Sequence, residues 1–427
     1  MKSVHYLGFA LLALVLSSPV LADDLYQALQ TVYQTNPQIL SAREQVKSAE
    51  AVVDMAWSGW KPAVGASASI GSASTEILDK TYKTTPIGVG VKLTQNIFQG
   101  FATSAQIDAA KYMFQAKQAS LSLTEQDVFL SAINAYIGVM NAKEVLTLQQ
   151  GNKKVLQKYY ARYKDMEKLG LLTQTDLMQA QARLEGANYR VIAAKTNYDN
   201  AKETFRRIYG KAENKYQDIS ISSVQTLFPK SLEEAEKLAL LAHPAIQAAN
   251  ASYQAANEDI TVSQQTLRPS VDIKASGMHY DDLPIVDNVK DARIGVYLTV
   301  PLYDKGVAGA QGNKAKFTAS AAKEQITQTQ RVVAENLRKA WNIYQAQDAA
   351  IKSANSRIKA NKQALNGIKD EQERGRRTVL DVLDAEQELL DSKVALAQAK
   401  HQKVSAFFAV LSGVGRLTAK DLKISKN

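Results

Sequence analysis

Cysteine is absent from the 427 residues, and proline (9), histidine (4) and glycine (21) are scarce. The absence of cysteine excludes disulfides, thiolate catalysis and thiolate metal sites. Few prolines and glycines predict long uninterrupted elements, and the abundant alanine, glutamine, lysine, glutamate and leucine are typical of long helices. After the first 22 residues no stretch approaches about 18 consecutive apolar residues, so no transmembrane helix is expected. If this chain crosses a membrane, it must therefore do so as a closed β-barrel.

The formal net charge of +10 does not by itself indicate a nucleic-acid partner. Basic and acidic residues are interspersed along the expected helices, which is typical of solvated helix faces. Nucleic-acid-binding proteins instead gather their basic residues on one face. No nucleic-acid partner is therefore expected.

The N-terminus has the pattern of a secretory signal peptide over residues 1–22. Lys2 precedes the apolar run "LGFALLALVL", and the segment ends in "SSPVLA" with a small residue at Ala22. This run is too short for a membrane span, and cleavage is expected before Asp23. Because the residue after the cleavage site is not cysteine, a lipid anchor is not expected there. The mature protein is predicted to be exported.

Four segments of the first half return in the same order in the second half, at offsets of 205 to 207 residues. The pairs are 24–42 with 231–249, 60–71 with 267–278, 88–98 with 293–303, and 168–184 with 373–389. Such internal similarity indicates a duplicated unit. We expect a first repeat over 23–210, a linker over 211–230, a second repeat over 231–412 and a C-terminal tail over 413–427.

Each repeat contains two segments in which apolar residues alternate with polar or very small ones. Val89 and Val91, for example, alternate with Gly88 and Gly90. The expected strands are 62–74, 86–98, 269–280 and 292–303. Alternation over about ten residues is typical of membrane β-barrels, although the face of a soluble sandwich would show it too.

Four strands cannot close a barrel, and lipid does not tolerate open sheet edges. Bacterial barrels begin at about eight strands. The predicted fold is therefore an α+β membrane protein whose transmembrane barrel is shared among protomers, four strands from each. Two protomers would supply eight strands and three would supply twelve, and both remain open on physical grounds.

Long helical hairpins are expected over 101–208 and 305–412, after the strands of each repeat. In the second hairpin, apolar and small residues recur at alternating steps of three and four, which indicates a coiled-coil seam. A helix of about 65 residues spans roughly 100 Å, more than any membrane. A solid coiled-coil rod is the alternative, but it would not explain strands that interrupt the helices twice. We therefore expect long, closely packed helices with one wet side, continuous with the strands; a coiled-coil barrel is what the family resemblance given below implies for them.

The stretch "RGRRTVLDVLDAEQELL" raises the question of what two aspartates, Asp381 and Asp384, do on one face of a helix. Thr378 and Asp381 have the spacing of a capping box, and Thr173 and Asp176 repeat it in the first half. Capping is thus the structural interpretation of Asp176 and Asp381, and a functional interpretation of both stays open beside it. Asp384 lies one turn further into the helix, where capping no longer explains it.

The remaining readings of the aspartate pair are a glycosidase, a metal site and a gate. A glycosidase needs carboxylates on opposite sides of a cleft, whereas these share one helical turn. A metal site would favour nearby histidines, but His243, His279 and His401 lie elsewhere in the sequence. No nucleophile elbow, phosphate-binding loop or zinc-protease motif is present. We expect no enzymatic activity, catalytic residue, cofactor or metal, and the gate interpretation stays open at this point beside the capping interpretation.

The repeated "NPQI" and "HPAI", the two strand pairs and "RTVLDVLDAEQELL" together resemble the TolC family of outer-membrane efflux and secretion channels. The resemblance covers essentially the whole mature chain. It implies a homotrimer with a twelve-stranded barrel in outer-membrane lipid and a long helical tunnel across the periplasm. It also implies docking on a periplasmic adaptor (membrane fusion) protein and an inner-membrane ABC or RND pump.

The run "VLDVLDAEQELLDSKVALAQA" most resembles the branch that serves type I protein secretion. The implied function is an exit duct that passes secreted polypeptides, small toxic compounds or both. A channel for multidrug efflux alone is the nearest alternative. A periplasmic coiled-coil structural or adaptor protein without a pore is the alternative of another class.

By the same resemblance, Asp381 and Asp384 would form acidic rings at the closed periplasmic tip. Arg377 would link across to Thr175 and Asp176 on the neighbouring hairpin and hold the tip shut. The family's founding channel has a tyrosine three residues before the glycine that corresponds to Gly375, and this chain has glutamine, Gln372, there. A glutamine retains a group that can hydrogen-bond to Asp176, so Gln372 is included in the expected latch.

Overall fold

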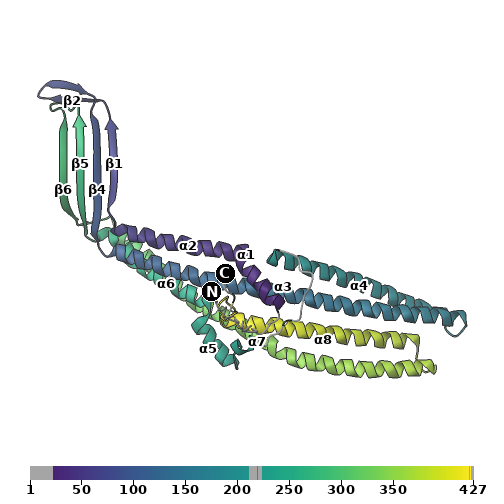
Figure 1. The fold of residues 1–427 in the computed structure, drawn as a ribbon. Coiled ribbons are helices and arrows are strands. Elements are labelled where there is room, and N and C mark those ends of the chain that lie inside the picture. The colour runs from purple at the N-terminus through teal and green to yellow at the C-terminus, as the bar shows by residue number, and fades with distance from the viewer. Residues whose placement is uncertain (1–22, 211–218, 220–223, 423, 425–427) are drawn as a thin grey trace, which may run out of the picture.

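The computed structural model describes residues 23–210, 219, 224–422 and 424. The expected signal peptide, most of the expected linker and the end of the tail lie outside these described residues. A β-sheet stands at one end of the molecule, and a long helical body extends from its base (Figure 1). α1, with which the described residues begin, lies near the middle of the helical body (Figure 1).

The helical body consists of two long hairpins and four shorter helices. The helices are α1 Asp23–Thr35, α2 Pro37–Trp57, α3 Ala102–Lys168, α4 Gln174–Tyr209, α5 Leu232–Ala242, α6 Pro244–Ser263, α7 Val307–Glu373 and α8 Val379–Gly413. α3 packs against α4 and α7 against α8, while α2 and α6 lie along α3. α3 and α7 each contain 67 residues and therefore extend about 100 Å. Among the described residues, no helix combines the length and apolarity that a membrane crossing needs.

α2 and α6 begin in the same way, with a capping side chain followed by proline at the first helical position. Asn36 accepts a hydrogen bond from the backbone N–H of Gln38 at 2.9 Å. His243 accepts one through Nδ1 from the N–H of Ala245 at 3.2 Å. Proline suits this position because its missing N–H would have no helical partner and its φ is already helical. The repeated "NPQI" and "HPAI" are therefore helix starts.

The strands β1 Ala63–Ile70, β4 Ile87–Gln99, β5 Ser270–Asp281 and β6 Val289–Thr299 form one antiparallel sheet in the order β1-β4-β5-β6. The β4–β5 pairing joins the two halves of the chain. β1 and β6 are open edges in the single protomer. The four expected strands are present, so the alternating pattern identified them correctly.

The strands differ from the expected bounds in two places. A hairpin of β2 Ala73–Ile77 and β3 Lys80–Thr84 extends beyond the sheet, where only the end of one strand was expected. Its turn residues Leu78 and Asp79 both have positive φ. Such a turn is usually signalled by Asn-Gly, which is absent here, so this hairpin was not predicted. β6 ends at Thr299, because Pro301 has no N–H for the ladder.

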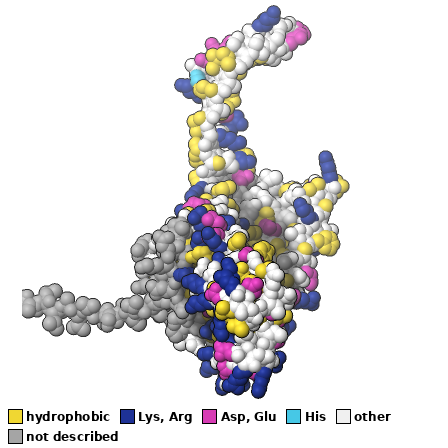
Figure 2. All heavy atoms as spheres, turned by 90° about the vertical axis from the view of Figure 1, so that its right-hand side faces the viewer, with side chains coloured by type: hydrophobic (Ala, Val, Ile, Leu, Met, Phe, Trp, Pro, Cys, Tyr) yellow, Lys and Arg dark blue, Asp and Glu magenta, His cyan; other side chains and the backbone are white. Residues whose placement is uncertain are grey.

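One face of the sheet is apolar and exposed in the protomer. Val91 and Val296 are 53% and 71% exposed. Residues of the opposite face include Lys92 and Lys274, in accordance with the period of two along each strand. Figure 2 shows hydrophobic side chains along one side of the strands.

The main core lies in the middle of the helical body, where α1, α3, α4 and α8 meet. Its largest fully buried side chains include Phe129, Tyr136, Phe205 and Phe407. Smaller apolar clusters continue toward the far end of the hairpins, with Leu383 buried at 2% exposure. The helices are thus held together by a central core, with thinner seams toward the sheet and toward the far end.

Candidate functional site

The two long hairpins turn at the end of the helical body farthest from the sheet, which we call the tip (Figure 1). The first turn comprises residues 169–173 and the second turn residues 374–378. Gly170 and Gly375 adopt φ of +72° and +73°. Glycine suits both positions because a side chain disfavours this left-handed conformation. The two turns therefore share one backbone design.

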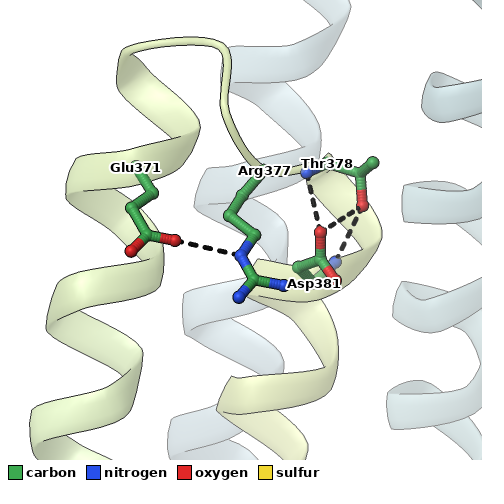
Figure 3. A network of polar contacts seen from close by, with 4 residues as sticks. All are labelled: Glu371, Arg377, Thr378 and Asp381. Carbon is green, nitrogen blue, oxygen red and sulfur yellow. Dashed lines mark hydrogen bonds and ion pairs between the residues drawn. The ribbon is translucent and has the colours of Figure 1, made fainter.

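The helix that leaves each turn is capped by a threonine and an aspartate. Thr173 Oγ1 accepts from Asp176 N at 3.1 Å and donates to the Asp176 carboxylate at 2.6 Å. Thr378 Oγ1 accepts from Asp381 N at 3.2 Å. The N–H and the hydroxyl of Thr378 each donate to Asp381 Oδ2 at 2.8 Å (Figure 3). The capping interpretation of both aspartates is confirmed.

These bonds also set the charge of Asp381. Hydrogen bonds from the backbone and hydroxyl of Thr378, together with the nearby Arg377 guanidinium, lower the pKa of Asp381 below its ordinary value. Hydrogen bonds to the ionised carboxylate favour that form. In the protomer, Asp381 is therefore negatively charged at neutral pH.

Arg377 is held across its own turn. Its Nε donates to Glu371 Oε2 at 3.0 Å, and its Nη1 lies 3.9 Å from Asp381 Oδ1 (Figure 3). Thr175 is exposed on the first turn's helix, and the side chain of Gln372 is partly buried in the last turn of α7. The link from Arg377 to Thr175 and Asp176 therefore remains a prediction, and it concerns contacts between neighbouring chains.

The second carboxylate of the pair connects the two hairpins. Asp384 on α8 forms an ion pair with Arg183 on α4. Arg162 on α3 pairs similarly with Glu373 on α7 at 3.3 Å. All four side chains are about half exposed, so each pair is worth at most about 1 kcal/mol. The sequence offered no signal for these pairs, whose partners are 201 and 211 residues apart.

A better shielded contact lies deeper along the same hairpins. Glu386 on α8 accepts from Tyr159 Oη on α3 at 3.1 Å and pairs with Lys369 Nζ on α7 at 2.8 Å. The Glu386 side chain is only 11% exposed. Burial raises the pKa of Tyr159, and burial of Tyr163 beside it raises that pKa to about 12. Both phenols therefore remain protonated at neutral pH.

Together these contacts make a set of links that we call the inter-hairpin contacts: Arg183–Asp384, Arg162–Glu373 and Glu386 with Tyr159 and Lys369. They hold the α7–α8 hairpin against the α3–α4 hairpin near the tip. These contacts do not place an activated nucleophile beside a base, as covalent chemistry would need. They can couple the position of one long hairpin to that of the other.

The model of the family described as "Outer membrane efflux protein" matches residues 28–211 and 236–416. The chain belongs to the outer membrane efflux protein family. The channel proteins of this family are not enzymes, and the chain is an outer-membrane protein with its helical part in the periplasm. The resemblance seen in the sequence is confirmed at the level of the family.

Relatives with outer-membrane and secretion names align along most of the chain. Outer membrane efflux protein BepC of Brucella suis is 29% identical, covering 94% of this chain and 87% of the relative. Outer membrane protein TolC of Escherichia coli is 25% identical, covering 95% and 85% respectively. Alkaline protease secretion protein AprF of Pseudomonas aeruginosa is 22% identical, covering 70% and 63%.

Solved structures share the fold. A CusC structure superposes with a TM-score of 0.83 at 16% identity, covering 92% of both chains. The outer membrane protein VceC of Vibrio cholerae superposes with a TM-score of 0.80 at 18% identity, covering 92% of this chain and 96% of VceC. At such identities the likeness shows the fold alone.

Proposed function

We propose that the chain is one protomer of a homotrimeric exit duct. Three copies of the sheet would close a twelve-stranded barrel, and three copies of the helical body would form a tunnel beneath it. The observation that supports this most is an apolar four-stranded sheet with two open edges, joined to helices of 67 residues. In lipid the unpaired N–H and C=O groups of β1 and β6 need partners, and a neighbouring protomer supplies them.

The duct would receive its cargo from an inner-membrane ABC or RND pump through a periplasmic adaptor. Type I polypeptide secretion is favoured by the run that begins at Val379, and the relatives include secretion proteins such as AprF. Efflux of small toxic compounds is the second candidate, supported by the efflux protein BepC, which aligns over more of the chain.

A deletion strain distinguishes these candidates. Loss of a secreted polypeptide from the medium together with unchanged drug tolerance would identify secretion, and the opposite pattern would identify efflux. Loss of both indicates a shared duct. An unaltered strain, or a protein recovered in a soluble periplasmic fraction, would contradict the exit-duct proposal. Re-expression of the wild-type chain is the matched control.

The tip would be the gate of this duct. In a trimer, Asp381 and Asp384 of three protomers would line the opening with six carboxylates. The latch of Arg377, Thr175, Asp176 and Gln372 would act between neighbouring hairpins, while the inter-hairpin contacts keep each protomer's hairpins together. A charge-assisted hydrogen bond contributes about 1.5–3 kcal/mol, so a few such links suffice to bias closure. A docking partner can overcome them.

Planar-bilayer recordings test the ring. We expect cation-selective conductance that trivalent cations block from the periplasmic side, and the double substitution Asp381→Ala with Asp384→Ala should remove the block. Asp391→Ala is the control, because Asp391 lies further along α8 and accepts from Gln387. Unchanged block in the double variant would place the pair outside the pore.

The latch is tested by Arg377→Ser combined with Asp176→Ala. Single-channel conductance should rise severalfold, and cells should become sensitive to large antibiotics such as vancomycin. Arg374→Ser, which removes an exposed charge from the same turn, serves as the control and should leave conductance unchanged. Wild-type conductance from an intact oligomer of the double variant would show that these residues do not hold the gate.

A further inference from the structure

The apolar face of the sheet is hollowed near the end that lies away from the helical body. The hollow has a volume of about 740 Å³. Gly277 is one of its lining residues and lies opposite Val91 on β4 and Ala292 on β6, and a Cβ added there would meet nothing within 4 Å. The other side chains that line it from this face are Ala66, Ala68, Val89, Val91, His279 and Lys290.

The register places these residues on one face. Val89 lies opposite both Ala68 and His279, and directly opposed residues point to the same side of a sheet. On the other face the Met278 side chain lies against Gly90. The lining also includes residues that belong to this other face, namely Ser67, Gly90, Met278 and Asp291. The free space over Gly277 lies on the apolar face, which is the face turned to lipid in the proposed barrel.

Two polar side chains lie at the distal rim of this apolar hollow. His279 on β5 and Lys290 on β6 are directly opposite each other. Among the described residues, His279 Nδ1 is buried without a hydrogen-bond partner and Lys290 forms no ion pair. Asp281 lies on the same face, one alternation further toward the distal end, opposite Ile87. Asp291, by contrast, is on the other face and pairs with Arg293.

The positions of His279 and Lys290 along their strands indicate the depth in the membrane at which they would lie. The helices join the sheet at the end formed by Ala63, Gln99, Ser270 and Thr299, and His279 and Lys290 lie at the other end. With the helical body in the periplasm, that distal end reaches the outer leaflet. A basic pair there coincides with the level of lipid headgroups, and the hollow beneath it coincides with the acyl chains.

We propose that this hollow binds a phosphorylated, multiply acylated lipid of the lipid A type from the outer leaflet. Its phosphate would accept hydrogen bonds from His279 and Lys290, and one acyl chain would lie over Gly277. A zwitterionic phospholipid fits less well, because its own ammonium group repels Lys290. The proposal rests on the proposed function, which orients the sheet in the membrane.

The test uses the full-length oligomer purified in detergent and titrated with lipid A, dephosphorylated lipid A or phosphatidylethanolamine, with binding read by native mass spectrometry. Lipid A should bind the wild type at least tenfold more tightly than either comparison lipid. His279→Asn with Lys290→Gln should remove this preference. Gly277→Leu, whose Cβ would meet nothing within 4 Å and whose side chain would occupy the hollow, should weaken binding of lipid A by a similar factor.

Two variants control for charge. Lys92→Gln removes one positive charge from the opposite face of β4 and should bind lipid A as the wild type does. Lys290→Arg keeps the charge at the rim and should retain the preference. Equal binding of all three lipids to the wild type, or an undiminished preference in the His279–Lys290 variant, would overturn the proposal.

Conductance of the same samples separates this inference from the proposed function. An oligomer that conducts but shows no lipid preference overturns only the lipid site. An oligomer that forms no pore overturns the duct, and the lipid site with it.

Discussion

The first and second turns at the tip have the same backbone design but carry different side chains. The first exposes Leu169 and Leu171, at 73% and 68%, whereas the second exposes the cations Arg374 and Arg376. The duplication thus kept what shapes the turn, a left-handed glycine and a threonine–aspartate cap. What each turn presents to a neighbour or a partner has diverged.

The divergence continues into the helices that leave the turns. Asp384 and Glu386 on α8 supply inter-hairpin contacts. At the offset of 205 residues that relates Gly170 to Gly375, their counterparts on α4 are the amides Gln179 and Gln181. The two acids through which α8 contacts the other hairpin therefore have no acidic counterparts at the equivalent positions of α4.

Strands from the two halves of the chain should respond equally to a charge on the apolar face. This substitution has the largest expected effect on stability. Val91→Arg in the first half and Val296→Arg in the second should each destabilise the proposed barrel by about 2–4 kcal/mol. Heat-modifiable migration of the oligomer on gels measures assembly. Thr94→Arg, on the opposite face, is the control and should assemble. Equal tolerance at all three positions would rule out a lipid-facing role for this face.

The caps of α2 and α6 differ in that His243 can be protonated and Asn36 cannot. We therefore expect stability to depend on pH, by an amount similar to that above. Burial lowers the pKa of His243 from 6.5 to about 4. Between these values the unfolded chain binds the proton and the folded chain does not, so stability is complete above about pH 6.5 and falls as the pH drops toward 4. The loss is on the order of 3 kcal/mol.

Melting temperatures at pH 7 and pH 4.5 measure this effect. His243→Asn, which copies the cap of Asn36, should remove most of the pH dependence attributable to this site. Asn36→His should add a second site of the same kind, because Asn36 is equally buried at 8% exposure. A wild-type pH profile in His243→Asn would contradict this account.

Replacing Glu386 of the second hairpin with glutamine, the residue at the equivalent position of the first, should have a smaller effect on stability. Glu386→Gln removes the ion pair with Lys369 but keeps a group that Tyr159 can reach, and it should destabilise the protein by about 1–2 kcal/mol. Lys369 is 37% exposed, which limits the cost of leaving it unpaired. Thermal unfolding is the measurement. Gln181→Glu, at the exposed position of α4 that corresponds to Glu386, should leave the free energy of unfolding nearly unchanged. A loss of stability equal to that of Glu386→Gln would show that the hairpins do not differ.

The smallest expected loss of stability comes from replacing the turn glycines, and it should be equal in the two hairpins. Gly170→Ala and Gly375→Ala each force a side chain into the left-handed region, at a cost of about 1 kcal/mol. Space is not limiting, because a Cβ at either glycine would meet nothing within 4 Å. Melting temperatures of the two variants should agree. Unequal losses would mean that one turn is strained by contacts outside its own backbone.

The sequence alone predicted the local and periodic features. Alternation identified the four strands, and the spacing of threonine and aspartate identified the helix caps at Thr173 with Asp176 and at Thr378 with Asp381. Each depends on residues within a few positions of one another, whose geometry is set by the helix or strand itself. The proposed gate residues were named by resemblance, and their contacts between protomers remain predictions.

The tertiary structure decided which distant residues meet. Arg183 and Tyr159 contact Asp384 and Glu386 across 201 and 227 residues of sequence. No local pattern marks such partners, because their proximity depends on how α3, α4, α7 and α8 pack. The hollow over Gly277 is likewise a product of strand register: each of its residues looks ordinary in its own strand, and only pairing places them on one face.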